Sequence, residues 1–278
     1  MRRLIINADD LGINPQRSHG IFMAAEQGIV TNVSVIPNMN DSDAAVRRSR
    51  ERDIPAGLHI NLTEGAPLSR DSDIDTLLTT DGFFLGRETL RRRMAEDEVK
   101  PEHIEREIRA QIEWFLDARG QPTHIDSHHH LHVHPQVIRM LIPILDRYAI
   151  SFVRVPSEPD VPFGFEIEPA RSRFIAEISR EAETARSLLQ ANRIGCTEHF
   201  RGMAFTGAAS MRNMRHILGR LPEGVTEWMV HPGSPNPNAE PFDADPQRQT
   251  ELNILLSDDT REELKSREIE LCSYGDLF

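Results

Sequence analysis

Short apolar runs alternate along the chain with longer segments in which apolar residues recur every three to four positions. The short runs end at Gly, Pro or Asp and predict strands. The longer segments predict helices; in one of them Ile104, Ile108 and Ile112 keep a helical period. The expected strands are 4–8, 31–36, 56–62, 123–127, 151–155, 194–198, 226–230 and 269–272, and the expected helices are 15–27, 41–52, 87–98, 102–118, 135–148, 171–192, 210–218, 247–256 and 260–266.

The regular alternation of strand and helix predicts an α/β fold with a parallel sheet, because parallel neighbours need a crossover connection. No composition change marks a linker, so we expect residues 1–278 to form a single domain. At this length a closed (β/α) barrel of seven or eight strands is favoured over an open doubly wound sheet. Two long polar loops, at 63–86 and 157–170, interrupt the alternation, and such loops are usually functional or mobile.

Composition narrows the choice of partners. The chain has 44 acidic and 32 basic residues, which argues against the basic face that nucleic acid needs and suits a metal cation or a neutral or cationic substrate. Two cysteines are too few for a disulfide framework, and no apolar run reaches the ~20 residues of a membrane helix or the length of a secretory signal. We therefore expect a cytoplasmic protein with neither nucleic acid nor membrane as partner.

Histidine is the unusual residue type, because six of the twelve fall between positions 124 and 134. In a (β/α) barrel the active site lies at the carboxyl ends of the strands. The polar residues expected at those ends are Asn7, Asp9 and Asp10; His59 and Asn61; His124, Asp126 and His128; Arg154; and His231. Carboxylates, imidazoles and one guanidinium are thus predicted to converge on a single rim.

Asp9 and Asp10 place two carboxylates side by side after the first strand. Their repulsion is costly unless a cation or a shared proton relieves it, so the functional interpretation is one metal ligand and one general base. The alternative is an acidic turn that caps the helix starting near Pro15. His59 is a metal ligand only if other ligands converge on it, because a lone histidine on a strand is more often structural.

The segment 123–135 carries the strongest signal. On a strand, His124, Asp126 and His128 share one face, which places Asp126 to orient an imidazole. A surface histidine tract that binds metals adventitiously is the alternative. Such a tract is typically terminal or flanked by Gly and Ser, whereas this one follows a strand and leads into a helix begun by Pro135. Periodicity leaves open which residue binds a metal among His128, His129, His130 and His132.

One Asp and two His form a three-ligand set with open positions for water and substrate, as catalytic metal sites require. Mixed nitrogen and oxygen ligands suit zinc, cobalt, nickel, manganese or iron better than magnesium. Beside such a metal, His231 is a general acid or a fourth ligand, unless it merely ends a strand. Arg154 is flanked by apolar residues and needs an anionic partner, so it either orients a catalytic Asp or forms a structural ion pair.

Three segments, 7–12, 57–59 and 123–135, resemble the YdjC-like carbohydrate deacetylases, which include the chitooligosaccharide deacetylases. The similarity keeps its order and spacing over nearly the whole chain. It implies a distorted (β/α) TIM-like barrel related to the NodB-type deacetylases. It also implies one divalent metal, treated in the family as magnesium, bound by Asp10, His59 and His128. By analogy with the NodB-type enzymes, Asp9 is expected to be the general base and His231 the general acid.

The resemblance implies metal-assisted hydrolysis of the N-acetyl group of an amino sugar or chitooligosaccharide. Arg154 is then expected to keep Asp9 placed and ionised. Rival interpretations are another mononuclear metallohydrolase, such as a phosphoesterase or a cyclic amide hydrolase, and a non-catalytic His-rich metal-binding protein. The expected partner is a small acetylated sugar, and a homodimer is compatible with the sequence. Residues expected to support the site or to contact substrate are Asn61, His124, Asp126, His129, His130 and His132.

Overall fold

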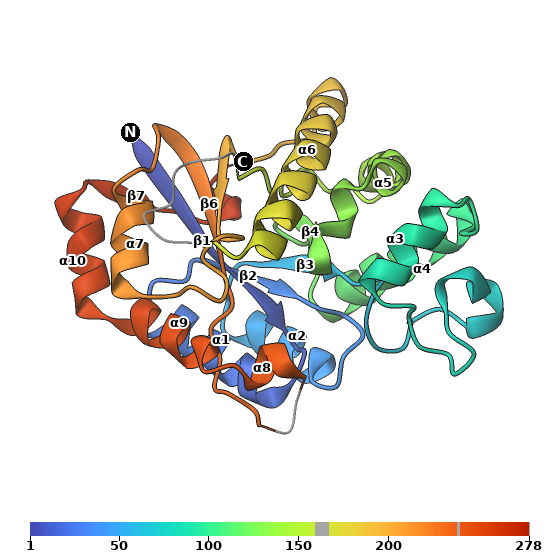
Figure 1. Cartoon of the computed structure of the whole chain (residues 1–278), viewed down its shortest axis with the longest axis horizontal. Coiled ribbons are helices and arrows are strands. Elements are labelled where there is room, and N and C mark those ends of the chain that lie inside the picture. Colours follow the sequence, from blue (N-terminus) through green and yellow to red (C-terminus); the bar gives the residue numbers. More distant parts are fainter. Residues whose placement is uncertain (159–166, 238–239, 278) are drawn as a thin grey trace.

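The computed structural model of the protein describes residues 1–158, 167–237 and 240–277. Its strands are β1 (Arg2–Leu11), β2 (Asn32–Val35), β3 (Ala56–Ile60), β4 (Ile125–Ser127), β5 (His199–Arg201), β6 (Gly224–Val230) and β7 (Ile269–Leu271). Neighbouring strands pair in the order β4-β3-β2-β1-β6-β5, and β7 pairs with β1 outside this row. β1 crosses the middle of the molecule (Figure 1).

Every ladder between these strands is parallel, as the alternation of strands and helices predicted. The ten-residue strand β1 has neighbours along both edges. One edge pairs with β6 from Arg2 to Ala8, and the other pairs with β7 near its start and with β2 from Asn7 onward. The carboxyl end of β1 therefore lies between β2 and β6.

The sheet curls into a half-barrel and does not form the closed barrel that the sequence favoured. Regular pairing ends at β4 on one side and at β5 on the other. In the described residues the expected strand 151–155 contributes only isolated bridges, Ile125 with Val153 and Phe152 with Gly195, so it joins its neighbours at single points and forms no ladder. The expected strand 194–198 is likewise wrong, since β5 begins at position 199. Seven strands are assigned in the described residues, the lower of the two expected numbers.

Helices pack around the sheet (Figure 1). Five of them have Pro in their first turn, where a missing backbone N–H is harmless. None of the helices in the described part of the chain combines the length and hydropathy that crossing a bilayer requires. The helices are α1 (Pro15–Glu26), α2 (Ser42–Glu51), α3 (Arg87–Ala95), α4 (Pro101–Ala118), α5 (Pro135–Arg147), α6 (Pro169–Ala191), α7 (Met211–Leu218), α8 (Pro241–Ala244), α9 (Gln247–Leu256) and α10 (Asp258–Ser266).

The two faces of the sheet differ in polarity. Leu4, Ile6 and Ala8 of β1 belong to the main apolar cluster, which the helices share. The residues between them point to the other face, where Asn7 donates a hydrogen bond of 2.8 Å to Ser34 of β2. This alternation leaves a buried polar layer inside the curl of the sheet. A second, small apolar cluster lies at the amino-terminal end of β1 and consists of Ile5, Val225, Cys272 and Tyr274.

The two expected loops have different outcomes. Segment 63–86 contains the 3-10 turns η1 (Asp71–Asp73) and η2 (Asp75–Leu77), and Leu78 bridges Phe84 in antiparallel fashion. Segment 63–86 is therefore a folded excursion from the half-barrel. Most of the other loop, 157–170, lies outside the described residues, and α6 begins two positions earlier than the expected 171.

Candidate metal centre and active site

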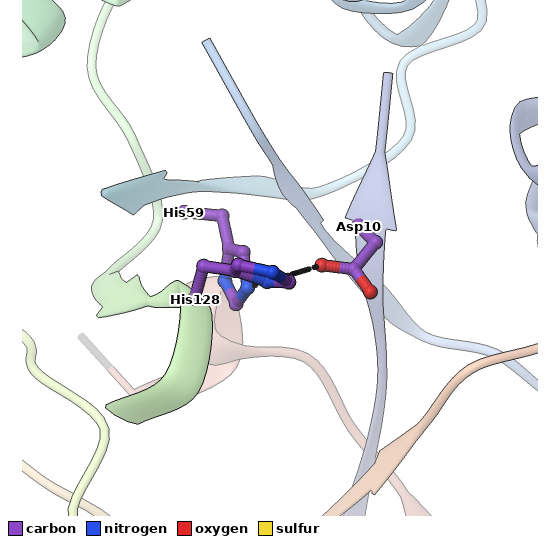
Figure 2. Close-up of side chains that lie close together, drawn as sticks. All are labelled: Asp10, His59 and His128. Carbon is purple, nitrogen blue, oxygen red and sulfur yellow. Dashed lines mark ion pairs between the residues drawn. The ribbon is translucent and has the colours of Figure 1, made fainter. Parts of the chain in front are cut away.

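Asp9 and Asp10 stand at an irregularity near the end of β1. The register of β1 against β2 shifts after Ala8, and Asp10 has a φ of +67°, in the left-handed region that non-glycine residues rarely adopt. A bulge of this kind releases neighbouring side chains from the alternation of a regular strand. Asp9 consequently belongs to the polar interior, whereas the Asp10 carboxylate faces His59 and His128 (Figure 2).

Asp10, His59 and His128, the three expected metal ligands, meet at the carboxyl ends of β1, β3 and β4 (Figure 2). His59 Nε2 lies 3.4 Å and His128 Nδ1 3.0 Å from Asp10 Oδ1. One ligand atom from each of the three residues lies within 4.8 Å of the others. Asp10 and His59 are buried, while the His128 side chain is 12% exposed. The cluster therefore reaches solvent on the His128 side.

The charges of this cluster fit a divalent cation. Both carboxylate oxygens of Asp10 are buried without a hydrogen bond of normal geometry. Burial raises the pKa of Asp10, but His128 and His59 outweigh burial and hold it well below its usual range. Burial lowers the pKa of both histidines, yet Asp126 raises that of His59 to about 10 and Asp10 raises that of His128 to about 9. Positive charge is thus stabilised where a carboxylate and two imidazoles offer ligand atoms.

A carboxylate lies behind each of the two histidines. Asp126 Oδ1 is 2.8 Å from His59 Nδ1, the ring nitrogen that faces away from Asp10. Glu64 Oε1 is 3.5 Å from His128 Nε2, which likewise faces away from Asp10. Metal-binding imidazoles commonly have such a partner, which fixes the ring and its tautomer. Asp126 thus occupies the place that strand periodicity predicted for it, whereas the half-exposed Glu64 was not anticipated.

Arg154 connects Asp9 to this cluster. Its Nη1 and Nη2 atoms donate hydrogen bonds to the two oxygens of Asp9, at 2.6 and 2.7 Å. The same Nη1 lies 2.8 Å from Asp126 Oδ2. Burial raises the pKa of Asp9, although Arg154 opposes this effect. A carboxylate with a raised pKa and a fixed orientation is suited to accept a proton.

His231 follows β6 and lies near the cluster, outside the group of three residues whose ligand atoms converge. Its backbone N–H donates a 2.6 Å hydrogen bond to Glu251, and the ring edge meets Phe242, with centroids 5.3 Å apart. The buried Nδ1 has no hydrogen-bond partner among the described residues. Burial, with Arg248 and Arg17, holds the pKa of His231 well below its usual range. The imidazole is therefore neutral at rest.

The sequence-family comparison decides the affiliation of the chain. The model of the YdjC-like proteins matches residues 3–266. The chain belongs to the YdjC-like family. This confirms the resemblance seen in the three sequence segments around the site.

The YdjC-like chain also matches curated relatives over its whole length. Proteins named carbohydrate deacetylase from Mus musculus and Homo sapiens are each 31% identical, over 99% of this chain and 94% and 91% of theirs. A third, from Brevibacillus brevis, is 30% identical over 99% of both chains. The crystal structure of a protein from Enterococcus faecalis V583, provisionally named for cellobiose-phosphate cleavage, superposes with a TM-score of 0.82 at 24% identity. It covers 99% of this chain and 98% of its own, and it shows the same fold.

The YdjC-like histidine segment bends sharply after β4. It forms η3 (His128–Val133), in which His129 and His130 have φ values of +55° and +56°. His130 is buried between Phe174 and Phe200. Strain of this kind is common where side chains must be held for function. Here the bend directs the side chain of His128 to Asp10 and those of His129 and His130 elsewhere.

The remaining expected histidines support the site in different ways. His132 has both ring nitrogens engaged, Nδ1 with Ser127 Oγ at 2.7 Å and Nε2 with the Arg154 carbonyl at 2.9 Å. It therefore holds the backbone of Arg154 and has no free nitrogen for a metal. His124 is buried deeper in the interior, with its ring stacked on Tyr274.

His129 and Asn61 shape the rim next to His128. His129 Nδ1 is 3.0 Å from Thr63 Oγ1, and its Nε2 lies 3.7 Å from Glu64. Asn61 Oδ1 accepts hydrogen bonds from the backbone N–H groups of Thr63 and Glu64, at 3.0 and 3.1 Å. Asn61 thus builds the turn that presents Glu64 to His128.

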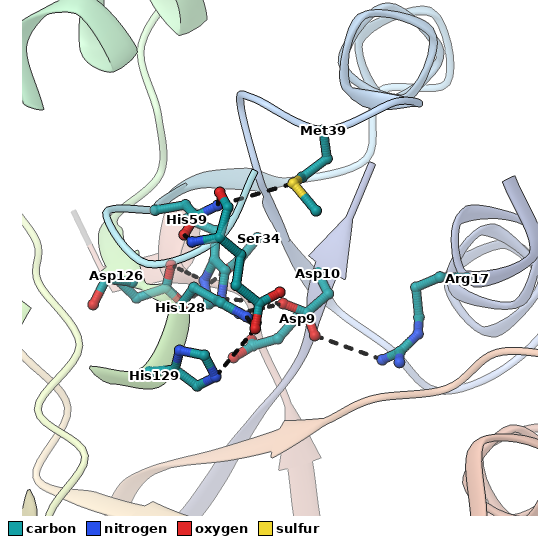
Figure 3. A network of polar contacts seen from close by, with 12 residues as sticks. Asp9, Asp10, Arg17, Ser34, Met39, His59, Asp126, His128 and His129 are labelled. Carbon is teal, nitrogen blue, oxygen red and sulfur yellow. Dashed lines mark hydrogen bonds and ion pairs between the residues drawn. The ribbon is translucent and has the colours of Figure 1, made fainter. Parts of the chain in front are cut away.

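Sequence reasoning missed Arg17 as well as Glu64. Arg17 Nη1 lies 3.7 Å from Asp10 Oδ2 and approaches from the side opposite His128 (Figure 3). It stands in the first turn of α1, directly after the strand that carries Asp10. A signal for it existed, because the first turn of a helix that follows a barrel strand lies at the rim of the active site.

Proposed function

We propose that this protein is a metal-dependent hydrolase that removes the N-acetyl group from an acetylated amino sugar or chitooligosaccharide, as a single catalytic domain over residues 1–278. The observation that carries the proposal is the meeting of Asp10, His59 and His128 beside the Asp9–Arg154 pair. A cation site next to a held carboxylate is the arrangement that hydrolysis of an amide needs. The curated relatives that bear the name carbohydrate deacetylase support the choice of an acetylated sugar.

Asp10, His59 and His128 are the residues that would hold one divalent ion. Bound there, the ion would polarise the acetyl carbonyl and make a neighbouring water more acidic. Two imidazoles and one carboxylate favour zinc, cobalt, nickel or manganese over magnesium. Asp126 and Glu64 serve this set by holding the ring planes of His59 and His128.

Asp9 is proposed as the general base. It removes a proton from the attacking water, and its raised pKa makes it a competent acceptor. Arg154 fixes the plane of the carboxylate through two parallel hydrogen bonds. The positive charge of Arg154 also offsets the repulsion between Asp9 and Asp126, because one oxygen of each carboxylate contacts the same guanidinium nitrogen, Nη1.

His231 is proposed to deliver the proton that the departing sugar amine requires. Its unpartnered Nδ1 is the available atom. Because the pKa of His231 is held low, the neutral ring takes up a proton from solvent as negative charge develops during the reaction and passes that proton to the amine nitrogen. Water is consumed, the C–N bond breaks, and the products are an amine and acetate. A neutral imidazole also suits a fourth metal ligand, and variants of His231 separate the two roles.

Acetate release tests this proposal. The purified protein is incubated with N,N′-diacetylchitobiose, N-acetylglucosamine, an aryl phosphate and a cyclic amide, each with and without chelator. We expect chelator-sensitive acetate from at least one acetylated sugar. Phosphate release or ring opening without acetate identifies a different metallohydrolase. Several metal ions per chain without hydrolysis identify a metal-binding protein, and either result overturns the proposal.

A further inference from the structure

A buried chain of hydrogen bonds extends from Asp9 to the carboxyl-terminal segment. Beyond Asp9, the Nε and Nη2 atoms of Arg154 lie 2.8 and 2.7 Å from Glu227 Oε1. The other oxygen, Glu227 Oε2, accepts a 2.6 Å hydrogen bond from the hydroxyl of Tyr274. The four residues are at most 1% exposed. Asp9 is thus linked, through two intermediate residues, to a tyrosine near the end of the chain.

The position of Tyr274 is fixed by the turn that it opens and by the packing of its ring. It opens η4 (Tyr274–Leu277), and the Ser273 backbone N–H and hydroxyl both donate to Asp276 Oδ2, at 2.7 and 2.8 Å. The Tyr274 ring stacks on His124, with centroids 4.0 Å apart and planes 7° apart. The ring also belongs to the small apolar cluster with Ile5. The hydroxyl therefore has a fixed position relative to β1 and β6.

The orientation of the Glu227 carboxylate depends on the Tyr274 hydroxyl. Arg154 faces three buried carboxylates, those of Asp9, Asp126 and Glu227, so their orientation decides how its five N–H groups are shared. Without the hydroxyl, Glu227 Oε2 would lose the donor that the structure gives it, in an interior where an unmatched carboxylate oxygen is strongly unfavourable. Glu227 would then turn toward Arg154 for compensation. Arg154 would follow, and its paired hydrogen bonds to Asp9 would be lost.

We infer that Tyr274 is a positioning residue of the active site, which acts through Glu227 and Arg154 on Asp9. This inference rests on the proposed function, because it takes Asp9 to be the base. Burial, together with Glu227, raises the pKa of Tyr274 well above its usual value, so the hydroxyl keeps the proton that it donates. The carboxyl-terminal segment is accordingly part of the catalytic architecture and does more than fill the interior.

The substitution Tyr274→Phe removes the hydroxyl and keeps the stacked ring. The chain offers a matched control, because its only other tyrosine, Tyr148, also donates its hydroxyl to a glutamate, Glu113, but at the surface. We expect Tyr274→Phe to lower kcat for acetate release about tenfold, with KM and metal stoichiometry unchanged. Tyr148→Phe is expected to match the parent in all three. A role confined to folding would lower the Tm of Tyr274→Phe and leave kcat per folded, metal-loaded protein unchanged.

A double-mutant cycle with Glu227→Gln identifies the route. If Tyr274 acts through Glu227, adding Tyr274→Phe to Glu227→Gln lowers kcat by less than twofold further. An equal loss in both backgrounds overturns the inference, as does a parental kcat in Tyr274→Phe. In those two cases the parent still releases acetate, so the proposed function stands. A parent that releases no acetate from any acetylated sugar overturns the function and the inference together.

Discussion

The guanidinium of Arg154 donates hydrogen bonds of 2.6 and 2.7 Å to the carboxylate of Asp9, although the two residues are 145 positions apart in the chain. The pair is bidentate, which fixes both the distance between the two groups and their common plane. Asp126 contacts the same guanidinium and also the His59 ring. Arg154 thus joins the proposed base, Asp9, to the carboxylate that orients His59, a proposed metal ligand. The geometry of Asp9 therefore depends on the arginine's shape as well as on its charge.

Arg154→Lys tests that dependence, because lysine keeps the charge and loses the planar pair of N–H groups. We expect kcat for acetate release to fall about 100-fold while one metal per chain is retained. Steady-state kinetics with metal analysis of the same sample measures both quantities. The exposed Arg139→Lys serves as control and should behave as the parent. Parental kcat in Arg154→Lys would show that charge alone suffices.

His128 and His130 are predicted to differ in metal binding. His128 Nδ1 is 3.0 Å from Asp10, whereas His130 is packed between two phenylalanine rings. We therefore expect His128→Ala to lose the metal and His130→Ala to keep one metal per chain. Elemental analysis of the two purified variants decides this, with circular dichroism to confirm folding. A full metal complement in His128→Ala contradicts the assigned ligand set.

His231→Asn separates proton delivery from metal ligation. As a proton donor, His231 should be needed for turnover only, so the variant is expected to lose about 100-fold or more in kcat and to retain its metal. The exposed His19→Asn is the matched control. Loss of the metal along with activity would instead make His231 a fourth ligand.

Gly20→Ala tests how closely α1 approaches the segment after His231. In an ordinary helix this change stabilises by about 1 kcal/mol. Here a Cβ at Gly20 would lie 2.5 Å from the Cα of Gly233, a backbone contact that cannot be relieved by a side-chain rotation. We expect a net loss of about 1–3 kcal/mol, measured as a lower Tm. Ser187→Ala, at an exposed position of α6, should leave the Tm nearly unchanged; a raised Tm in Gly20→Ala would refute the close contact.

Periodicity alone predicted much of the architecture. Alternating polarity correctly placed Asp126 on the site face of its strand, where it meets His59 in register across β3 and β4. The switch from strand to helix pattern located all the helices of nine residues or more in the described residues to within a few positions. Such signals are strong because burial of one face imposes a regular spacing.

The details that periodicity missed arise where the backbone is irregular. The bulge at Asp10 and the positive φ values at His129 and His130 depend on tertiary contacts, so no local spacing shows that adjacent side chains diverge there. Segment 151–155 has strand composition but finds only single bridging partners. The roles of Glu64 and Glu227 depend on contacts between segments that are distant in sequence. For Glu227 a sequence signal did exist, because it is a charged residue inside the apolar run around Trp228.

The most direct test of the account is removal and return of the metal, with acetate release as the readout. The parent and Asp10→Asn are dialysed against chelator and then titrated with zinc, cobalt, manganese or magnesium in the presence of the acetylated sugar that serves best as substrate. We expect the parent to lose acetate release on dialysis and to regain it at one equivalent of metal, while Asp10→Asn neither binds the metal nor releases acetate. Undiminished acetate release from the metal-free parent, or from Asp10→Asn, would contradict this expectation.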